Sequence, residues 1–273
     1  MNNYNGMIRP RIAASSYLNT APLIWSFLYG SRRGSVDLIT DTAPARCAEM
    51  LVNGEVDAAL APVIEYQRIP NMAIVPDVCV GSRSAVRSVV LVTRTNNLKK
   101  VRSVALDVSS RTSAILVKII FAEFLGSEPQ WQDSAPDLRS MLRHSDAALI
   151  IGDPAMQIPR NEFRVFDLAT LWNDFTGLGF VFAMWMTRKE ALAKIRPIDF
   201  AGARDEGLGN LDHIVARDEN LNGLSTDEIR QYLTRNIVFS VDPEMKKGLT
   251  FYFELAQKHK LIDKAKPLDF VTY

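Results

Sequence analysis

The sequence predicts an α/β protein with mainly parallel sheets, arranged as two lobes with a ligand cleft between them. Short apolar strands alternate with helical stretches along the chain. Polar motifs follow directly after these strands, at residues 15–20, 61–65, 109–113, 152–155 and 176–179. Because ligands bind beyond the carboxyl ends of parallel strands in open α/β sheets, we expect these motifs to line one site.

The first β/α series covers the N-terminal third of the chain. Strands are expected at residues 11–14, 36–40, 56–61, 74–80 and 86–94. Helices are expected at residues 22–28 and 43–53. Pro22 lies where a helix can begin, and Gly54 provides a C-terminal stop for the second helix.

A second series follows, and helices dominate the C-terminal third. Strands are expected at residues 101–106, 147–151, 165–168 and 177–186. Helices are expected at residues 113–125, 135–143, 168–174, 189–194, 198–208, 211–220, 226–233 and 243–260. We assign residues 8–92 and 187–273 to lobe 1, and residues 93–186 to lobe 2.

Composition narrows the class of protein. The chain has 273 residues, of which 47% are hydrophobic and 23% charged, as in globular proteins that fold in water. A formal net charge of +1 without any basic block argues against nucleic acid as a partner. No apolar run reaches the roughly 18 residues that a membrane helix needs, and the polar N-terminus does not resemble a secretory signal. We therefore expect a cytoplasmic protein with no membrane partner.

The cysteines and histidines do not predict a metal site. Cys47 and Cys79 are the only cysteines, and they lack the spacing of metal ligands. His144, His213 and His259 lie far apart in the sequence. Two cysteines allow either one disulfide or, in a reducing cytosol, two free thiols. We expect no metal and no cofactor.

The segment 106–113 (LDVSSRTS) is the most informative local motif. An apolar strand runs into a cluster of hydroxyl side chains, and a helical run follows at once. A helix N-terminus exposes unpaired N–H groups and the positive end of a dipole, so it attracts carboxylates and phosphates. Ordinary helix capping explains one or two of these hydroxyls. The candidate ligand-binding residues of the motif are Ser109, Ser110, Arg111, Thr112 and Ser113.

Six blocks in order resemble the chorismate dehydratase (MqnA) family of menaquinone biosynthesis by the futalosine pathway. They are residues 16–23 (SYLNTAPL), 53–66 (NGEVDAALAPVIEY), 86–91 (VRSVVL), 106–113, 150–155 (IIGDPA) and 172–185 (WNDFTGLGFVFAMW). The resemblance extends over roughly residues 8–260. Gly179 departs from it, since the family usually has proline there.

The resemblance implies a type-2 periplasmic-binding-protein-like fold, in which each lobe is a mixed sheet flanked by helices. It also implies conversion of chorismate to 3-[(1-carboxyvinyl)oxy]benzoate and water. Asn19 and Ser88 match the residues that matter most in the family, and we predict that they are catalytic. Further predicted substrate-binding residues are Ser16, Tyr17, Gly152, Asp153, Gly177, Leu178 and Phe180.

The residue types of these motifs suit positioning rather than strong acid–base chemistry. No histidine lies in any motif, whereas Asn, Ser and Thr side chains can hold carboxylates in one conformation. A carboxylate of the substrate is therefore expected to take the ring proton. Asp153 and Glu65 are the acidic exceptions. Asp153 also suits a capping or hinge role, and Glu65 suits a cap or a surface ion pair.

Three other functions fit parts of the sequence. A non-enzymatic solute-binding protein for a small carboxylate shares the expected fold but should carry an export signal. The sister enzyme 1,4-dihydroxy-6-naphthoate synthase should place a histidine in the cleft. A ligand-sensing regulatory domain should be fused to a DNA-binding segment. From the resemblance, we expect chorismate as the only partner. We expect the protein itself to be a monomer or a homodimer.

Overall fold

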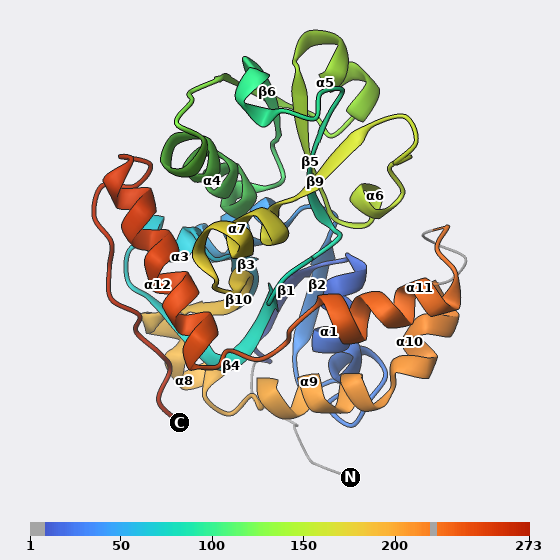
Figure 1. The fold of residues 1–273 in the computed structure, drawn as a ribbon. Helices are drawn as coiled ribbons and strands as arrows, with labels where there is room; N and C mark the ends of the chain where they lie inside the picture. The colour runs from blue at the N-terminus through green and yellow to red at the C-terminus, as the bar shows by residue number, and fades with distance from the viewer. Residues whose placement is uncertain (1–8, 219–222) are drawn as a thin grey trace.

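The computed structural model describes residues 9–218 and 223–273, and their strands form two mixed sheets of five strands each (Figure 1). Lobe 1 is built on the sheet with strand order β2-β1-β3-β10-β4. Its strands are β1 (Arg11–Ser15), β2 (Asp37–Asp41), β3 (Ala58–Pro62), β4 (Met72–Ser82) and β10 (Phe180–Arg188). Lobe 2 is built on the order β7-β6-β8-β5-β9. Its strands are β5 (Val89–Thr93), β6 (Ser103–Asp107), β7 (Gln130–Ser134), β8 (Ala147–Ile151) and β9 (Arg164–Asp167).

Each sheet joins a parallel half to an antiparallel half. In lobe 1, β1 is parallel to β2 and β3, while β10 is antiparallel to both β3 and β4. In lobe 2, β6 is parallel to β7 and β8, while β5 is antiparallel to β8 and β9. The predicted α/β class with mixed sheets is confirmed.

The pairing of β5 and β10 shows where the chain changes sheets. β5 hydrogen-bonds in the sheet of lobe 2, and β10 hydrogen-bonds in the sheet of lobe 1. The chain therefore enters lobe 2 through residues 83–88 and returns through residues 177–179. These crossings lie a few residues before the predicted boundaries at 92/93 and 186/187.

Helices cover both sheets and continue beyond them. Those before β10 are α1 (Ala21–Leu28), α2 (Pro44–Val52), α3 (Glu65–Arg68), α4 (Arg111–Ile119), α5 (Leu138–His144), α6 (Asp153–Met156) and α7 (Leu168–Thr176). Those after it are α8 (Leu192–Ile195), α9 (Phe200–Gly209), α10 (Leu211–Asp218), α11 (Thr226–Gln231) and α12 (Pro243–Lys258). Figure 1 shows α12 running along one side of lobe 1 up to α4 of lobe 2, and the two helices are in contact.

Shorter helical turns complete the chain. A 3-10 turn at Leu18–Thr20 precedes α1, and others lie at Leu98–Lys100 and Lys189–Ala191. The helix predicted at 113–125 is α4 followed by a π-helical turn, Ile120–Leu125. A second π-helical turn, Tyr232–Asn236, follows α11. β7 lies outside the predicted strands, because its residues are mostly polar and lie at the edge of the sheet.

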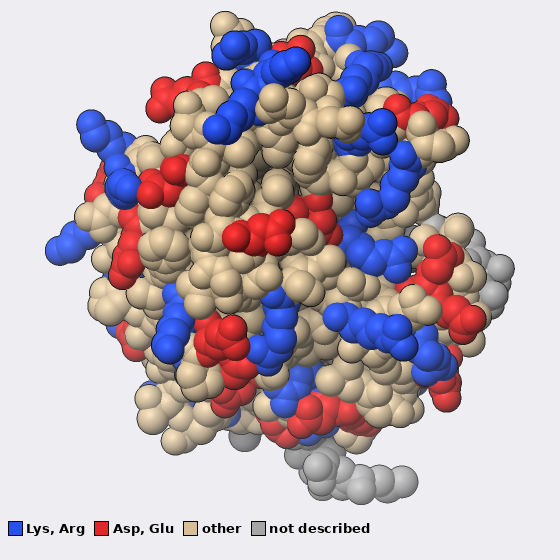
Figure 2. All heavy atoms as spheres, in the orientation of Figure 1, with Lys and Arg blue, Asp and Glu red and all other residues tan. Residues whose placement is uncertain are grey.

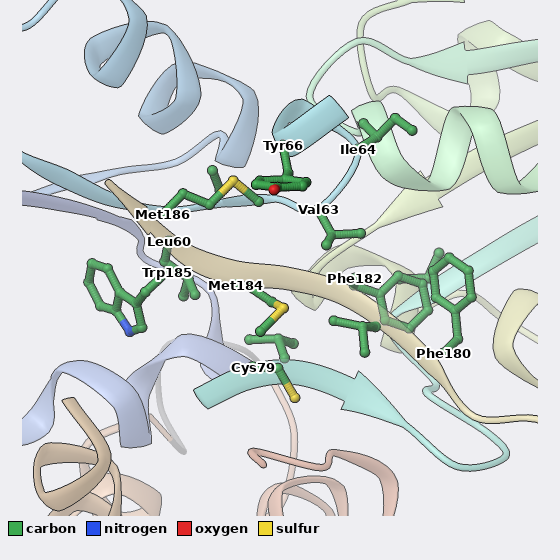
Figure 3. Packing of buried hydrophobic residues seen from close by; sticks show 14 of the residues in the cluster. Leu60, Val63, Ile64, Tyr66, Cys79, Phe180, Phe182, Met184, Trp185 and Met186 are labelled. Atoms are coloured by element: carbon green, nitrogen blue, oxygen red, sulfur yellow. The ribbon is translucent and has the colours of Figure 1, made fainter. Parts of the chain in front are cut away.

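One hydrophobic core runs through both lobes, and β10 lies at its centre (Figure 3). At the end of β10 nearest lobe 2, the ring centroids of Phe180 and Phe182 are 4.7 Å apart. The ring of Phe180 also packs against Trp172 of α7 and Tyr252 of α12, with centroids 5.4 and 5.0 Å away. This aromatic group joins the lobes behind the cleft. A second, smaller core covers the other face of the lobe 2 sheet.

Gly179 lies where α12 and the chain returning from lobe 2 touch. A Cβ at residue 179 would lie 2.4 Å from Sδ of Met245, and a Cβ on Gly248 would lie 2.1 Å from the carbonyl oxygen of Gly179. Both distances are too short for packing. The close backbone approach requires glycine at residue 248, whereas the contact at residue 179 is with the end of a flexible methionine side chain.

No helix within residues 9–218 or 223–273 combines the length and apolar character needed to cross a membrane.

Candidate functional site

A cavity lies between the two lobes, at the carboxyl ends of β1, β3, β6 and β8. Its volume free of protein atoms, including the open mouth, is about 570 Å³. The lining residues from the first 89 positions are Ser15, Tyr17, Asn19, Thr20, Pro44, Leu60, Pro62, Val80, Val86, Ser88 and Val89. Those that follow are Ser109, Ser110, Arg111, Thr112, Ser113, Ile151, Gly152, Phe182 and Ala183. The cavity wall therefore carries hydroxyl groups, the Asn19 amide and the Arg111 side chain, and the rest of it is apolar.

The lobe 1 wall presents a chain of hydrogen-bonded polar side chains. β1 ends at Ser15, whose Oγ lies 3.0 Å from Oγ1 of Thr20. The Thr20 hydroxyl donates to Oδ1 of Asn19 at 3.4 Å. The 3-10 turn that contains Asn19 brings these three side chains together, and Pro22 in the first turn of α1 fixes where the helix starts.

Ser88 lies in the crossing from lobe 1 to lobe 2 and is fully buried. Its Oγ accepts a hydrogen bond of 2.7 Å from the hydroxyl of Tyr232, which begins the π-helical turn after α11. The Asn19 side chain lies close enough to the Tyr232 hydroxyl to lower its pKa, but burial has the larger effect. Burial raises the pKa of Tyr232 well above its usual value, so the phenol keeps its proton.

The lobe 2 wall is the N-terminus of α4. Ser110 is the N-cap residue, yet no side chain caps the first turn. The backbone N–H groups of Arg111, Thr112 and Ser113 therefore have no acceptor within the helix. The dipole of α4 adds partial positive charge at the same place. This wall suits an anionic group of a ligand.

Arg111 and Thr112 connect this wall to lobe 1. The guanidinium of Arg111 pairs with Glu65 at 3.0 Å and with Glu49 at 2.5 Å. Oγ1 of Thr112 accepts a hydrogen bond of 3.3 Å from the backbone N–H of Ile64. The side chain of Glu65 is only 4% exposed and also pairs with an arginine on its own helix. Arg111 is thus held by two carboxylates of lobe 1.

Tyr17 and Leu18 close the cleft from lobe 1. The ring of Tyr17 lies against Gly152, where a Cβ would be 2.5 Å from Cζ of the tyrosine. Ser109 of lobe 2 lies close enough to the Tyr17 hydroxyl to lower its pKa, but burial has the larger effect. The backbone N–H of Leu18 donates to the carboxylate of Asp153, at 3.1 and 3.3 Å. The described lobes are therefore in a closed arrangement.

Asp107 supports this contact from within lobe 2. Its Oδ1 accepts hydrogen bonds from the backbone N–H and the hydroxyl of Ser109, at 2.8 and 2.6 Å. Burial is the largest cause of a raised pKa at Asp107, and it also raises the pKa of Tyr17. The bond that the Ser109 hydroxyl donates to Asp107 fixes the orientation of this side chain beside Tyr17.

The structure brings most of the predicted site residues to this one cavity. Asn19 and Ser88 line it, together with Tyr17, Ser109, Ser110, Arg111, Thr112, Ser113 and Gly152. Asp153 is buried behind the wall and bonds Leu18, as a capping or latch residue would.

Four predicted residues lie elsewhere. Ser16 faces a second cavity, between α1 and α10, that is also lined by Trp25 and His213. Tyr17 also lines this second cavity, so Tyr17 borders both cavities whereas Ser16 borders only the second. Gly177 and Leu178 form the turn after α7, and Phe180 packs in the aromatic group behind the cavity. No residue of that loop lines the cavity.

Several residues that line or support the cavity were not predicted. Ser15 and Thr20 lie in the first motif but were not distinguished from its other hydroxyl residues. Phe182 and Ala183 belong to an apolar strand, and its pattern does not show which residues face the cleft. Tyr232 reads as a core position of an amphipathic helix, and no sequence signal marks it as part of a site.

Figure 2 shows lysine and arginine side chains spread among acidic side chains over the face that is drawn. Within the cavity, positive charge comes from the α4 N-terminus and Arg111.

Solved structures of other proteins share this fold at low sequence identity. A protein from Archaeoglobus fulgidus is 14% identical, with a TM-score of 0.75 over 93% of this chain and 98% of the other. A Candida albicans protein described as having the generic periplasmic binding protein fold is 14% identical, with a TM-score of 0.70 over 95% and 92%. The periplasmic aliphatic sulphonate binding protein of Escherichia coli is 17% identical, with a TM-score of 0.63 over 97% and 94%. The predicted periplasmic-binding-protein-like fold is confirmed.

Sequence comparison identifies the family. A curated relative from Thermus thermophilus named chorismate dehydratase is 29% identical over 258 residues, which cover 87% of this chain and 92% of the relative. A family model described as menaquinone biosynthesis matches residues 10–258. With nearly the whole chain matched, this protein belongs to the menaquinone biosynthesis family.

Proposed function

We propose that this protein is a chorismate dehydratase, a hydro-lyase that converts chorismate to 3-[(1-carboxyvinyl)oxy]benzoate and water. The family and the name of the Thermus thermophilus relative support this activity. The observation that carries it in the structure is that an uncapped helix N-terminus faces Asn19 and Ser88 across one cavity. Such a cavity can hold a carboxylate on one wall and donate to a departing hydroxyl on the other. The proposed activity belongs to the cytoplasm and requires no cofactor.

The lobe 2 wall would hold the substrate through its charge. Chorismate carries two carboxylates, and the free N–H groups of α4 and the hydroxyls of Ser110 and Ser113 can donate to one of them. Arg111 reinforces the positive potential of this wall, although Glu49 and Glu65 already pair with it. The apolar part of the lining, including Phe182 and Leu60, would exclude water from the ring.

The lobe 1 wall would assist the bond that breaks. A ring C–H bond breaks and its electron pair helps to form the aromatic ring, while the neighbouring C–O bond breaks and hydroxide leaves. Asn19 and Ser88 can donate hydrogen bonds to that leaving oxygen. The substrate's own carboxylate takes the ring proton, and that proton and the hydroxide together make one water. Aromatisation supplies the driving force, so the protein's contribution is chiefly position.

The direct test is incubation of the purified protein with chorismate, with the products read by mass spectrometry and ultraviolet absorbance. We expect a product lighter by one water with a benzoate spectrum. Asn19→Ala should lower kcat about a hundredfold or more, because a donor to the leaving oxygen is lost. Asn53→Ala is the matched control, since Asn53 bonds Glu55 on the exposed surface.

Two other results would contradict the proposal. Chorismate binding without turnover by the wild-type protein would favour a solute-binding function, which the fold also supports. Absence of any binding would remove chorismate as the ligand.

A further inference from the structure

We propose that Tyr232 is a positioning residue that orients Asn19 and Ser88 for the dehydration, an inference that rests on the proposed function. Tyr232 comes from the C-terminal segment, more than 140 residues from Ser88 in the sequence. It is fully buried, and its ring lies outside the cavity lining. Its hydroxyl reaches the backs of both predicted catalytic side chains.

The directions of the hydrogen bonds follow from the number of protons available. A tyrosine hydroxyl has one proton, and Tyr232 donates it to Oγ of Ser88 at 2.7 Å. Asn19 lowers the pKa of Tyr232, as a donor group near the phenol oxygen does, so its amide Nδ2 is the atom turned toward Tyr232. This agrees with Oδ1 of Asn19 accepting from Thr20 at 3.4 Å.

In this arrangement, the remaining polar protons of Ser88 and Asn19 can point into the cavity. Ser88 accepts from Tyr232, so its own hydroxyl proton is free to point at the substrate. Asn19 turns one amide proton toward Tyr232 and keeps the other for the substrate. The chain Ser15, Thr20, Asn19, Tyr232 and Ser88 is therefore a polar network in which two members end as donors toward the ligand.

Local backbone geometry places the hydroxyl at this point. Tyr232 begins a π-helical turn that continues to Asn236, where the amide of Asn236 donates to the carbonyl of Ala85 at 2.9 Å. That bond attaches the turn to the crossing that contains Ser88. π-Helical turns within helices are uncommon and often occur at functional sites.

The test compares Tyr232→Phe with the wild type under steady-state conditions. Only the hydroxyl is removed, so the ring keeps its packing. We expect kcat to fall about tenfold to a hundredfold, while KM for chorismate stays within about threefold. Tyr66→Phe is the matched control, because Tyr66 is equally buried and its hydroxyl bonds the C-terminal tail away from the cavity. It should keep the wild-type kcat.

A double-mutant cycle with Ser88→Ala separates positioning from general support. If Tyr232 acts through Ser88 and Asn19, its removal should cost much less in the Ser88→Ala background than in the wild type. Fully additive losses would overturn the inference. An unchanged kcat in Tyr232→Phe would also overturn it. A parallel loss of affinity, turnover and thermal stability would overturn it as well, because it indicates a structural role only.

The wild-type assay distinguishes this inference from the function on which it rests. A wild-type protein that does not dehydrate chorismate overturns both. An active wild type with an unaffected Tyr232→Phe variant overturns only the role of Tyr232.

Discussion

The two walls of the cavity are built in different ways. On the lobe 1 wall, hydrogen bonds already join Ser15, Thr20 and Asn19, and Ser88 is hydrogen-bonded to Tyr232 behind it. On the lobe 2 wall, the first turn of α4 has no side-chain cap. The side chains of one wall are held in place by bonds to one another, and the other wall has backbone donors that a bound anion would satisfy. We therefore expect lobe 1 to orient the ligand and lobe 2 to contribute most of the affinity for its charge.

The contact between the walls can be broken most severely at Gly152. Its φ of +71° and ψ of −158° belong to a region that only glycine adopts readily, and a Cβ would collide with Tyr17. Gly152→Ala should cost about 3 kcal/mol or more of stability and open the cleft. Gly126→Ala is the control, since Gly126 has a positive φ of 62° but open space around it, and should cost about 1 kcal/mol. Urea unfolding of both variants measures this; equal losses would show that the Tyr17 contact does not matter.

A negative charge on the lobe 2 wall should weaken binding of an anionic ligand without disturbing the lobe 1 wall. In Ser110→Asp the new carboxylate would take the free N–H groups and repel an anionic ligand, so KM for chorismate should rise about tenfold or more. Thermal stability should be kept, because aspartate is a good N-cap residue. Ser110→Asn provides the same shape without the charge and should change KM by less than about threefold. Similar KM values for the two variants would mean that α4 does not bind the ligand's carboxylate.

Glu206 of α9 stabilises the lobe 1 wall, and this contribution to the free energy of unfolding depends on pH. Hydrogen bonds from Ser26 and Ser31 lower the pKa of Glu206 to about 2 and fix α1, which follows Asn19. Because the pKa is lower in the folded state, this contribution is present above about pH 4.5 and is lost as the pH falls toward 2. The carboxylate is partly exposed and water screens it, so Glu206→Gln should cost about 1 kcal/mol at pH 7.

Chemical denaturation of Glu206→Gln from pH 7 down to pH 3 checks this, with the difference from the wild type shrinking as the pH falls. Glu254→Gln on the exposed face of α12 is the control. A pH-independent difference would mean that Glu206 acts through packing alone.

The smallest effect is expected for alkylation of the two cysteine thiols. The rate of this reaction depends on whether lobe 1 opens. Burial raises the pKa of Cys47 to about 12 and that of Cys79 still further, so neither forms the reactive thiolate near neutral pH. Iodoacetamide at pH 8 should label neither cysteine in the folded protein, and chorismate should not change this result. Labelling in urea gives the full count for comparison. Rapid labelling of the folded protein would show that lobe 1 is not a preformed wall.

Much of the fold could be predicted from the sequence because its strands are apolar and its helices have clear stops. Strands such as Ala147–Ile151 were predicted with their observed bounds. β7 could not be predicted, since an edge strand with polar residues lacks the apolar pattern on which prediction depends. The π-helical turn at Ile120–Leu125 was also missed, because its apolar spacing resembles that of a continuing α-helix.

The site could be predicted in part, for a related reason. Polar motifs that follow strand ends meet at one edge of a sheet, so Asn19, Ser88 and the α4 N-terminus could be placed together. Tyr232 could not, because its contact with Ser88 depends on how a distant helix packs. The turn at Gly177 and Leu178 was assigned to the site, but packing against α12 holds it behind the cavity.

The antiparallel pairing of β4 with β10 has a consequence for how the lobes are connected. Phe180 pairs with Ser82, so the points where the chain leaves and re-enters the lobe 1 sheet are adjacent. In terms of connectivity, all of lobe 2 is the loop of a single β-hairpin. An inserted domain attached through two neighbouring strand ends can turn about that attachment without disturbing the sheet that carries it. Residues 83–88 and 177–179 would absorb such a rotation, and Ser88, within the first of these segments, would move with it.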